Sequence, residues 1–180
     1  MPVYVNAASL HLYDILNNGP IVLVKNMIAE RLSSLGIDLS TRPAPIGSYS
    51  PVMITSNFAY VSGQIALDPS KQPAEVKFKG KVGKDVSISD AKKAAELCVI
   101  NGLCQLNSAL GDLERIKNFV KLSGYINCEH TFVDHATIMN GASDFIIQIF
   151  EDKGKHARVA VGVNSLPLNS CIEIDLIVEI

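Results

Sequence analysis

The size pattern of residues 157–163 does most to constrain what this chain can fold into. The segment ARVAVGV alternates valine with alanine and glycine, and a period of two is typical of a β-strand. We predict that the valines pack on one face of this strand and that the other face carries almost no side chain. A face so poorly covered needs a partner, so we expect water or another subunit to lie against it.

An arginine stands at the head of the sparsely covered face. Arg158 precedes Ala160 and Gly162 along that face, and residues this small leave room for a ligand. A guanidinium can grip a carboxylate through two parallel hydrogen bonds. An arginine that only closes the end of a sheet is the other interpretation, and the spacing leaves both open.

Acidic residues mark one face of the last predicted strand. Glu173, Asp175 and Glu179 alternate with aliphatic residues, which is the usual pattern of a strand whose acidic face meets solvent. Glu173 could instead exchange protons with a substrate. That role requires burial, which raises the pKa of a carboxyl group.

Two further candidates come from residues 43–65. Tyr49 lies in a predicted loop from which its hydroxyl can reach a cleft, and Gly63 in mid-strand indicates a bulge or a close approach by another backbone. The chain has no glycine-rich phosphate loop and no GxSxG motif. Spacing by itself therefore indicates an α+β domain with a candidate anion site.

The remaining patterns supply the elements of one domain. Predicted in order are strands at 52–56 and 59–67, a helix at 87–111, a strand at 115–126, a helix at 132–154, and strands at 157–165 and 170–180. This β-β-α-β-α-β-β order predicts an α+β two-layer sandwich, with a mixed sheet and two main helices on one face. We assign residues 41–180 to this domain and residues 1–40 to an N-terminal extension with a short helix from Asn26.

Local signals place the ends of several elements. Ser87 is predicted to cap the first long helix, and Gly154 to cap the second. A turn at Leu166–Asn169 joins the last two strands. Part of the long polar loop at 68–85 is expected to pair as a short ribbon.

Charge and cysteine content narrow the classes of function. A formal net charge of -2 gives no basic surface, so a nucleic-acid partner is not expected. The four cysteines have no CxxC spacing, which predicts buried free thiols in a reducing cytoplasm. The histidines show no zinc-binding spacing, so no metal is expected and His130 and His135 are predicted to be solvated. No run has the length of a membrane span, and the first residues lack a signal-peptide pattern.

Four segments together resemble the reactive intermediate deaminase A family, called RidA or YjgF and often labelled endoribonuclease L-PSP. They are PAPIGSYSP at 43–51, FAYVSGQIALDP at 58–69, NGASDF at 140–145 and ARVAVGVNSLPLNSCIEIDLIVEI at 157–180. The likeness runs from Ala44 to Ile180. The long polar loop, the segment KGKVGKD and the segment HARVAVGVNSLPLN are similar to those of a branch of the family that carries an N-terminal extension.

The resemblance implies a chorismate-mutase-like fold and a homotrimer, in which three sheets form a central barrel and ligand clefts lie between adjacent subunits. The strand of Arg158 would then look into such a cleft. The implied activity is hydrolysis of enamine and imine intermediates, such as 2-aminoacrylate, to 2-keto acids and ammonia, without metal or cofactor. A non-catalytic protein that binds or senses small carboxylates is the alternative within the same family.

The resemblance also implies the site residues. Arg158 matches the carboxylate-binding arginine, and Glu173 matches the acidic residue that orients or activates water. The implied substrate-binding set is Arg158, Tyr49, Ser62, Gly63 and Asn140. Two departures leave the activity and the substrate open: Ala160 replaces a cysteine that many deaminase-active members carry, and His156 replaces the usual proline.

Overall fold

Five strands form one mixed sheet in the computed structural model, which describes residues 27–40, 47–68, 70–71 and 73–180. The strands are β1 (Val52–Thr55), β2 (Phe58–Ile65), β5 (Asn118–Asn127), β6 (Ala157–Val163) and β7 (Ile172–Glu179). They lie in the order β1-β2-β7-β5-β6; β5 and β6 are parallel, and the other neighbours are antiparallel. A separate ribbon of β3 (Leu67–Asp68) and β4 (Glu75–Val76) confirms the pairing predicted inside the polar loop.

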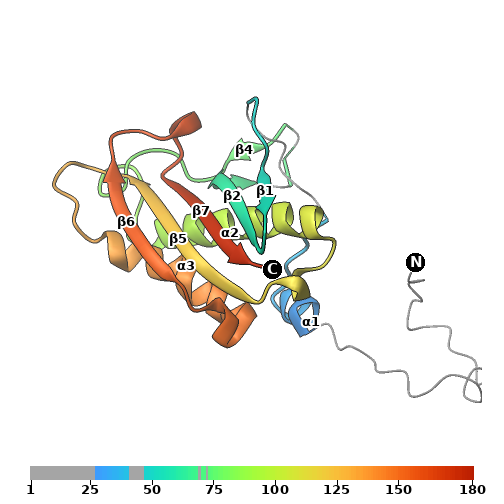
Figure 1. Cartoon of the computed structure of the whole chain (residues 1–180). Coiled ribbons are helices and arrows are strands. Elements are labelled where there is room, and N and C mark those ends of the chain that lie inside the picture. The colour runs from blue at the N-terminus through green and yellow to red at the C-terminus, as the bar shows by residue number, and fades with distance from the viewer. Residues whose placement is uncertain (1–26, 41–46, 69, 72) are drawn as a thin grey trace, which may run out of the picture.

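The helices cover one side of this sheet. The long helices α2 (Ile88–Leu110) and α3 (His135–Phe150) lie behind the sheet in Figure 1. The short helix α1 (Met27–Ser34) packs beside α3 and confirms the helix predicted from Asn26. The predicted α+β two-layer sandwich is therefore confirmed. The part of the N-terminal extension before residue 27 lies outside the described residues.

Both ends of α2 form as the sequence predicts. The Ser87 hydroxyl oxygen accepts a hydrogen bond from the Asp90 backbone N–H at 3.1 Å, which satisfies one of the amide groups left open at a helix start. At the other end Gly111 adopts a left-handed φ of 78°, and its N–H donates to the Asn107 carbonyl.

The end of α3 differs from its prediction. The α-helix stops at Phe150, and Glu151 follows with a φ of 53° before a 3₁₀ turn, η2 (Glu151–Gly154). Gly154 is therefore not the cap of α3. A Cβ at this position would lie 2.9 Å from the Ile146 carbonyl oxygen. Close packing therefore requires glycine here, and a left-handed cap does not.

The hairpin before β2 is shifted from its predicted position, whereas the turn before β7 forms where it is predicted. The hairpin turn between β1 and β2 is made by Ser56, with a φ of 50°, and Asn57, so Phe58 belongs to β2. The turn before β7 is the 3₁₀ turn η3 (Pro167–Asn169), as predicted, but the strands it joins are not neighbours. The β5–α3–β6 crossover makes β6 the parallel partner of β5, so β5 separates β6 from β7.

The core lies between the sheet and its helices. In β7 alternate side chains are buried on the helix-covered face, including Ile172, Ile174 and Val178, each with no exposed surface. Glu173 and the residues alternating with it lie on the helix-free face. This separation of an aliphatic face from an acidic face is the one that the sequence predicts.

In β6 the prediction of which face packs is wrong. Arg158 is in register with Leu122 of β5, a fully buried side chain on the helix-covered face. Arg158, Ala160 and Gly162 therefore face α3. Val159 and Val161 lie on the helix-free face and are 38% and 40% exposed. The sparsely covered face of this strand is thus the inner one.

Crowding by α3 explains the small residues on that inner face. A Cβ on Gly162 would lie 2.7 Å from Nε2 of His135, the first residue of α3. A side chain at position 162 would overlap His135, while the valines remain on the side that no helix of the described chain covers.

The contact between α2 and α3 gives a direct test of the packing. A Cβ on Gly141 would lie 2.9 Å from the Lys92 carbonyl oxygen, and backbone atoms cannot swing aside. We expect Gly141→Ala to lower the free energy of unfolding by about 1–3 kcal/mol, even though alanine favours a helix by about 1 kcal/mol over glycine. Denaturant unfolding measures this difference.

The matched control for that prediction is Thr137→Ala, an exposed position of the same helix. It should change the free energy of unfolding by no more than about 0.5 kcal/mol. A Gly141→Ala variant as stable as the wild type would show that the two helices are not held as closely as described.

Candidate functional site

The Arg158 side chain is held by α3. Its Nη1 donates to Oδ1 of Asn140 and to Oγ of Ser143, each at 3.0 Å. Asn140 and Ser143 are three residues apart and so project from the same side of the helix. The structure therefore brings together Arg158 and Asn140, two of the residues that the sequence singles out, and adds Ser143.

A chain of hydrogen bonds continues from Ser143 to the end of η2. Nε2 of His156 lies 3.0 Å from the Ser143 hydroxyl, and Nδ1 of His156 lies 2.6 Å from the Gly154 carbonyl oxygen. A carbonyl only accepts, so we assign the proton of a neutral His156 to Nδ1. Its Nε2 then accepts from Ser143, whose oxygen accepts from Arg158. His156, conspicuous in the sequence as a departure from proline, thus orients the arginine through Ser143.

This arrangement leaves the outer edge of the guanidinium open. Both hydrogen bonds of Arg158 use Nη1, and its Nη2 and Nε make none within the described residues. The residue is exposed. A guanidinium edge with two parallel N–H groups matches the two oxygens of a carboxylate, so the geometry fits an anion-binding role.

A second group of predicted residues gathers around Glu173. A β-bulge interrupts the pairing of β2 with β7 between Val61 and Gln64, and Gly63 lies in it. A Cβ on Gly63 would overlap the Glu173 carboxylate. The sequence indicates a bulge or a close backbone approach at this glycine; the bulge is present, and the group that approaches is the Glu173 side chain.

The loop that carries Tyr49 is tied to the same bulge. The Ser62 hydroxyl donates to the Ser50 carbonyl oxygen at 2.8 Å, and the Ser62 backbone N–H donates to the Pro51 carbonyl at 2.9 Å. Tyr49, the residue before Ser50, is 46% exposed. Ser62 and Gly63 therefore connect Glu173 with the tyrosine loop.

The environment of Glu173 favours its protonated form. Partial burial raises the pKa of its carboxyl group, and the nearby Asp175 carboxylate raises this pKa further. Asp175 accepts a hydrogen bond at 2.9 Å from the hydroxyl of Tyr125, and Tyr125 pairs with Glu173 across β5 and β7. Sequence reasoning gave no role to Tyr125, because only the strand register places it here.

The two groups lie on opposite faces of the sheet. Arg158 and Asn140 are on the face that α3 covers, whereas Glu173 lies on the helix-free face. One chain therefore divides the predicted site into an arginine half, Arg158 with Asn140 and Ser143, and a glutamate half, Glu173 with Gly63, Ser62 and the Tyr49 loop.

The cysteines and the remaining histidines are the other reactive side chains of the described residues. Cys98, Cys104, Cys128 and Cys171 are all free and buried, as predicted. His130 is exposed, but His135 is not solvated as predicted: its Nε2 lies 3.6 Å from Sγ of Cys128. Among the described residues, no three His, Cys, Asp or Glu side chains form a group that could hold a metal ion.

The described part of the chain also contains no helix that is long and apolar enough to span a membrane.

The fold and the two half-sites define a class: an α+β sandwich with an arginine on one sheet face and a carboxyl group on the other. Residues 29–180 match the family described as "YjgF/chorismate mutase-like, putative endoribonuclease". The chain belongs to this YjgF/RidA family, which confirms the resemblance seen in its motifs.

Relatives in several organisms share most of the chain. Protein TCP17 of Trypanosoma cruzi is 34% identical over 88% of this chain and 98% of its own length. Protein MMF1 of Saccharomyces cerevisiae, described as mitochondrial, is 33% identical over 77% of this chain and 81% of its own. A crystal structure of Atu1372 from Agrobacterium tumefaciens, a protein of unknown function, is 41% identical, covers 86% of this chain and 92% of its own, and has a TM-score of 0.78.

The raised pKa of Glu173 predicts a specific dependence of stability on pH. Glu173 keeps its proton to a higher pH in the folded protein than in the unfolded chain. The folded protein therefore binds more protons in that pH range, so the contribution of Glu173 to stability falls as pH rises. The fall begins near the ordinary value of 4.5 and ends above the raised folded pKa. We expect Glu173→Gln to become progressively more stable than the wild type across this window.

Denaturant unfolding at pH 4 and pH 7 measures the difference. Glu75→Gln, at an exposed position of β4, is the control for the loss of one negative charge. If the wild type and Glu173→Gln keep a constant difference in unfolding free energy between the two pH values, the glutamate is not desolvated as described.

Proposed function

We propose that the protein hydrolyses reactive enamine and imine intermediates of the 2-aminoacrylate type to 2-keto acids and ammonia, without a cofactor. The observation that carries the proposal is the arginine half-site. Arg158 is held from one side by Asn140 and Ser143, and its other edge is exposed and free to bind a ligand. The substrates of this reaction carry a carboxylate, which is the group that such an edge binds most specifically.

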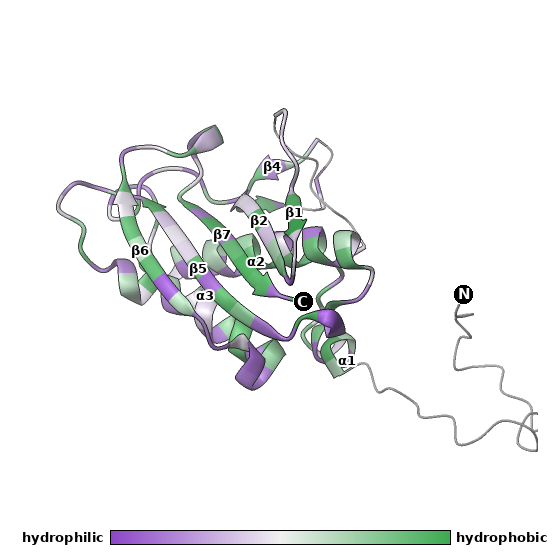
Figure 2. Cartoon of the chain, viewed as in Figure 1, coloured by the Kyte–Doolittle hydropathy of each residue, from purple (hydrophilic) through white to green (hydrophobic). Residues whose placement is uncertain are grey.

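A complete site requires a second copy of the chain, and we propose a homotrimer. The helix-free face of the sheet supports this, because large apolar side chains on it are exposed: Met53, Tyr60, Val159 and Val161. Figure 2 shows hydrophobic residues along β1, β6 and β7. Association through this face buries that apolar surface. Because Arg158 lies on the edge strand β6, we propose that the glutamate half of one subunit meets the arginine half of its neighbour at that edge.

The proposed chemistry follows from the groups in the two halves. The carboxylate of the imine binds Arg158, which fixes the position of the adjacent C=N carbon. Water adds to that carbon while Glu173 transfers a proton between water and the departing nitrogen. A carboxyl group whose pKa is raised by burial suits both directions of this transfer, and the products are a 2-keto acid and ammonia.

The remaining candidates shape the cleft in this proposal. Tyr49 and Asn140 line it, and Ser62 and Gly63 form the strand segment that borders it. Ala160, two residues beyond Arg158 on the same face of β6, leaves a wider floor than a larger side chain would. We propose a cytoplasmic location for the protein and keep residues 41–180 as the proposed domain.

Replacement of the arginine tests the proposed activity. Arg158→Ala should lower kcat/KM for imine hydrolysis by at least about 100-fold, because the reacting carbon is no longer positioned. Arg158→Lys keeps the charge but loses the paired N–H groups, so an intermediate loss is expected. The measurement couples an enzyme that generates the imine to the detection of ammonia and keto acid.

Two comparisons make the assay decisive. Lys84→Ala, which removes an exposed positive charge elsewhere, should behave as the wild type. If the wild type itself does not exceed spontaneous hydrolysis but binds 2-keto acids in an Arg158-dependent manner, the protein is a carboxylate-binding module and not a deaminase. RNA degradation that survives repurification would instead support a nuclease.

A further inference from the structure

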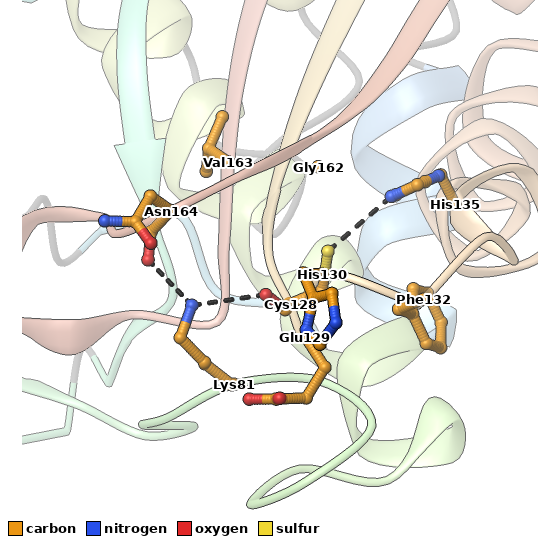
Figure 3. A pocket seen from close by; sticks show the side chains of 9 residues that line it. All are labelled: Lys81, Cys128, Glu129, His130, Phe132, His135, Gly162, Val163 and Asn164. Carbon is orange, nitrogen blue, oxygen red and sulfur yellow. Dashed lines mark hydrogen bonds between the residues drawn. The ribbon is translucent and has the colours of Figure 1, made fainter.

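A cavity lies at the opposite end of β6 from Arg158. Its volume is about 500 Å³, and Figure 3 shows the side chains that line it. They come from the loop before α2, the end of β5, the start of α3 and the end of β6: Lys81, Cys128, Glu129, His130, Phe132, His135, Gly162, Val163 and Asn164. The arginine half and the glutamate half contribute none of them.

A thiol and an imidazole meet in this cavity. Sγ of Cys128 lies 3.6 Å from Nε2 of His135, within reach of an S–H···N hydrogen bond. The ring of Phe132 packs edge-on against His135, with centroids 5.6 Å apart, and so restricts the imidazole. A Cβ on Gly162 would come within 2.9 Å of the sulfur and 2.7 Å of the nitrogen. Glycine at this position of β6 therefore makes room for the pair.

The thiol is protonated at rest and has a base beside it. Burial raises the pKa of Cys128, and the Glu129 carboxylate adds to this, while the Lys81 ammonium opposes it. A protonated thiol becomes a nucleophile when a neighbouring base removes its proton during attack. Nε2 of His135 is placed to be that base.

Lys81 supplies charge without occupying the cavity. Its ammonium donates to Oδ1 of Asn127 at 3.2 Å, to the Cys128 carbonyl at 3.2 Å and to the Asn164 carbonyl at 2.7 Å. These three acceptors match the three donors of an ammonium. Lys81 therefore ties the ends of β5 and β6 together, and its positive charge favours negative charge that develops in the cavity.

The other three cysteines lack this setting. Cys98 and Cys171 have no exposed surface, and Cys104 is 2% exposed. Burial raises the pKa of Cys104 to about 11 and that of Cys171 to about 12. Cys128, at 8% exposure, is the thiol of the four that combines a cavity with a base at contact distance.

We propose that Cys128 and His135 form a nucleophilic site that takes up small α,β-unsaturated carbonyl compounds by conjugate addition. The sulfur forms a bond to the β-carbon as His135 accepts the thiol proton. The π electrons move to the carbonyl oxygen, where the charge of Lys81 favours the enolate. The imidazolium then returns the proton to the α-carbon. The adduct contains all atoms of both reactants, and no oxidant or reductant takes part.

The chemistry of the cavity selects this class of ligand. Phe132, Val163 and Gly162 offer apolar contact, whereas His135 offers the polar group beside the thiol. A small conjugated carbonyl has a matching apolar body with one acceptor oxygen. The addition also uses the same proton twice, so one base, His135, is enough for both proton transfers.

The test labels the full-length protein with methyl vinyl ketone and follows each cysteine by peptide mass spectrometry. Cys128 should react at least about tenfold faster than Cys98, Cys104 or Cys171 in the same sample. Its rate should approach a plateau as the probe concentration rises, because a cavity binds before it reacts. Equal rates at the four cysteines, or a strictly linear dependence on probe concentration, would overturn the proposal.

Two histidine variants separate base assistance from simple access. His135→Gln should slow the labelling of Cys128 by about 10- to 100-fold, while His130→Gln, on the same cavity, should leave the rate near that of the wild type. Continued protection of Cys98 in both variants reports that they are folded. If both variants label Cys128 as fast as the wild type, His135 is not the base. Arg158→Ala should keep the wild-type labelling rate, so this proposal and the deaminase proposal can fail separately.

Discussion

The pleat of the central sheet turns Arg158 toward α3 and Glu173 toward the helix-free face, and the functional account depends on this separation. Side chains alternate between the faces of a strand. The pairing of β5 with both of its neighbours is continuous from Lys121 to Ile126, which fixes the two side chains relative to each other. No change of rotamer brings them together through the sheet. A site that uses both groups must therefore be built by two copies of the chain.

Contacts within one chain orient each half of such a site. Arg158 is oriented by a helix and, through Ser143 and His156, by the end of η2. Glu173 lies in the bulge of β2, where Gly63 removes the Cβ that would displace it. Positioning groups in advance is what a reaction of an already electrophilic imine requires, because little is left to be done beyond orientation and proton transfer.

The sequence was a good guide where one local rule decides the structure, and a poor one where register or layer order decides it. The Ser87 cap, the alternation in β7 and the order of elements follow from propensity and period, and all three are confirmed. Period alone cannot say which face of an edge strand is inner, so the valines of β6 were assigned to the wrong side. Ser143 and Tyr125 were not predicted. Helix spacing brings Ser143 to Arg158, and strand register brings Tyr125 to Asp175. The family motif identified Glu173 as a candidate, but only the structure shows that its carboxyl group is partly buried.

The most direct test of a shared site is complementation between two inactive variants. Arg158→Ala and Glu173→Gln are unfolded together in equal amounts, refolded as a mixture and assayed for ammonia release from the imine. If each site takes its arginine from one subunit and its glutamate from the next, about a quarter of the sites in a randomly assembled closed ring are intact. A site shared in this way should restore about that fraction of wild-type activity. A mixture no more active than either variant alone would contradict it.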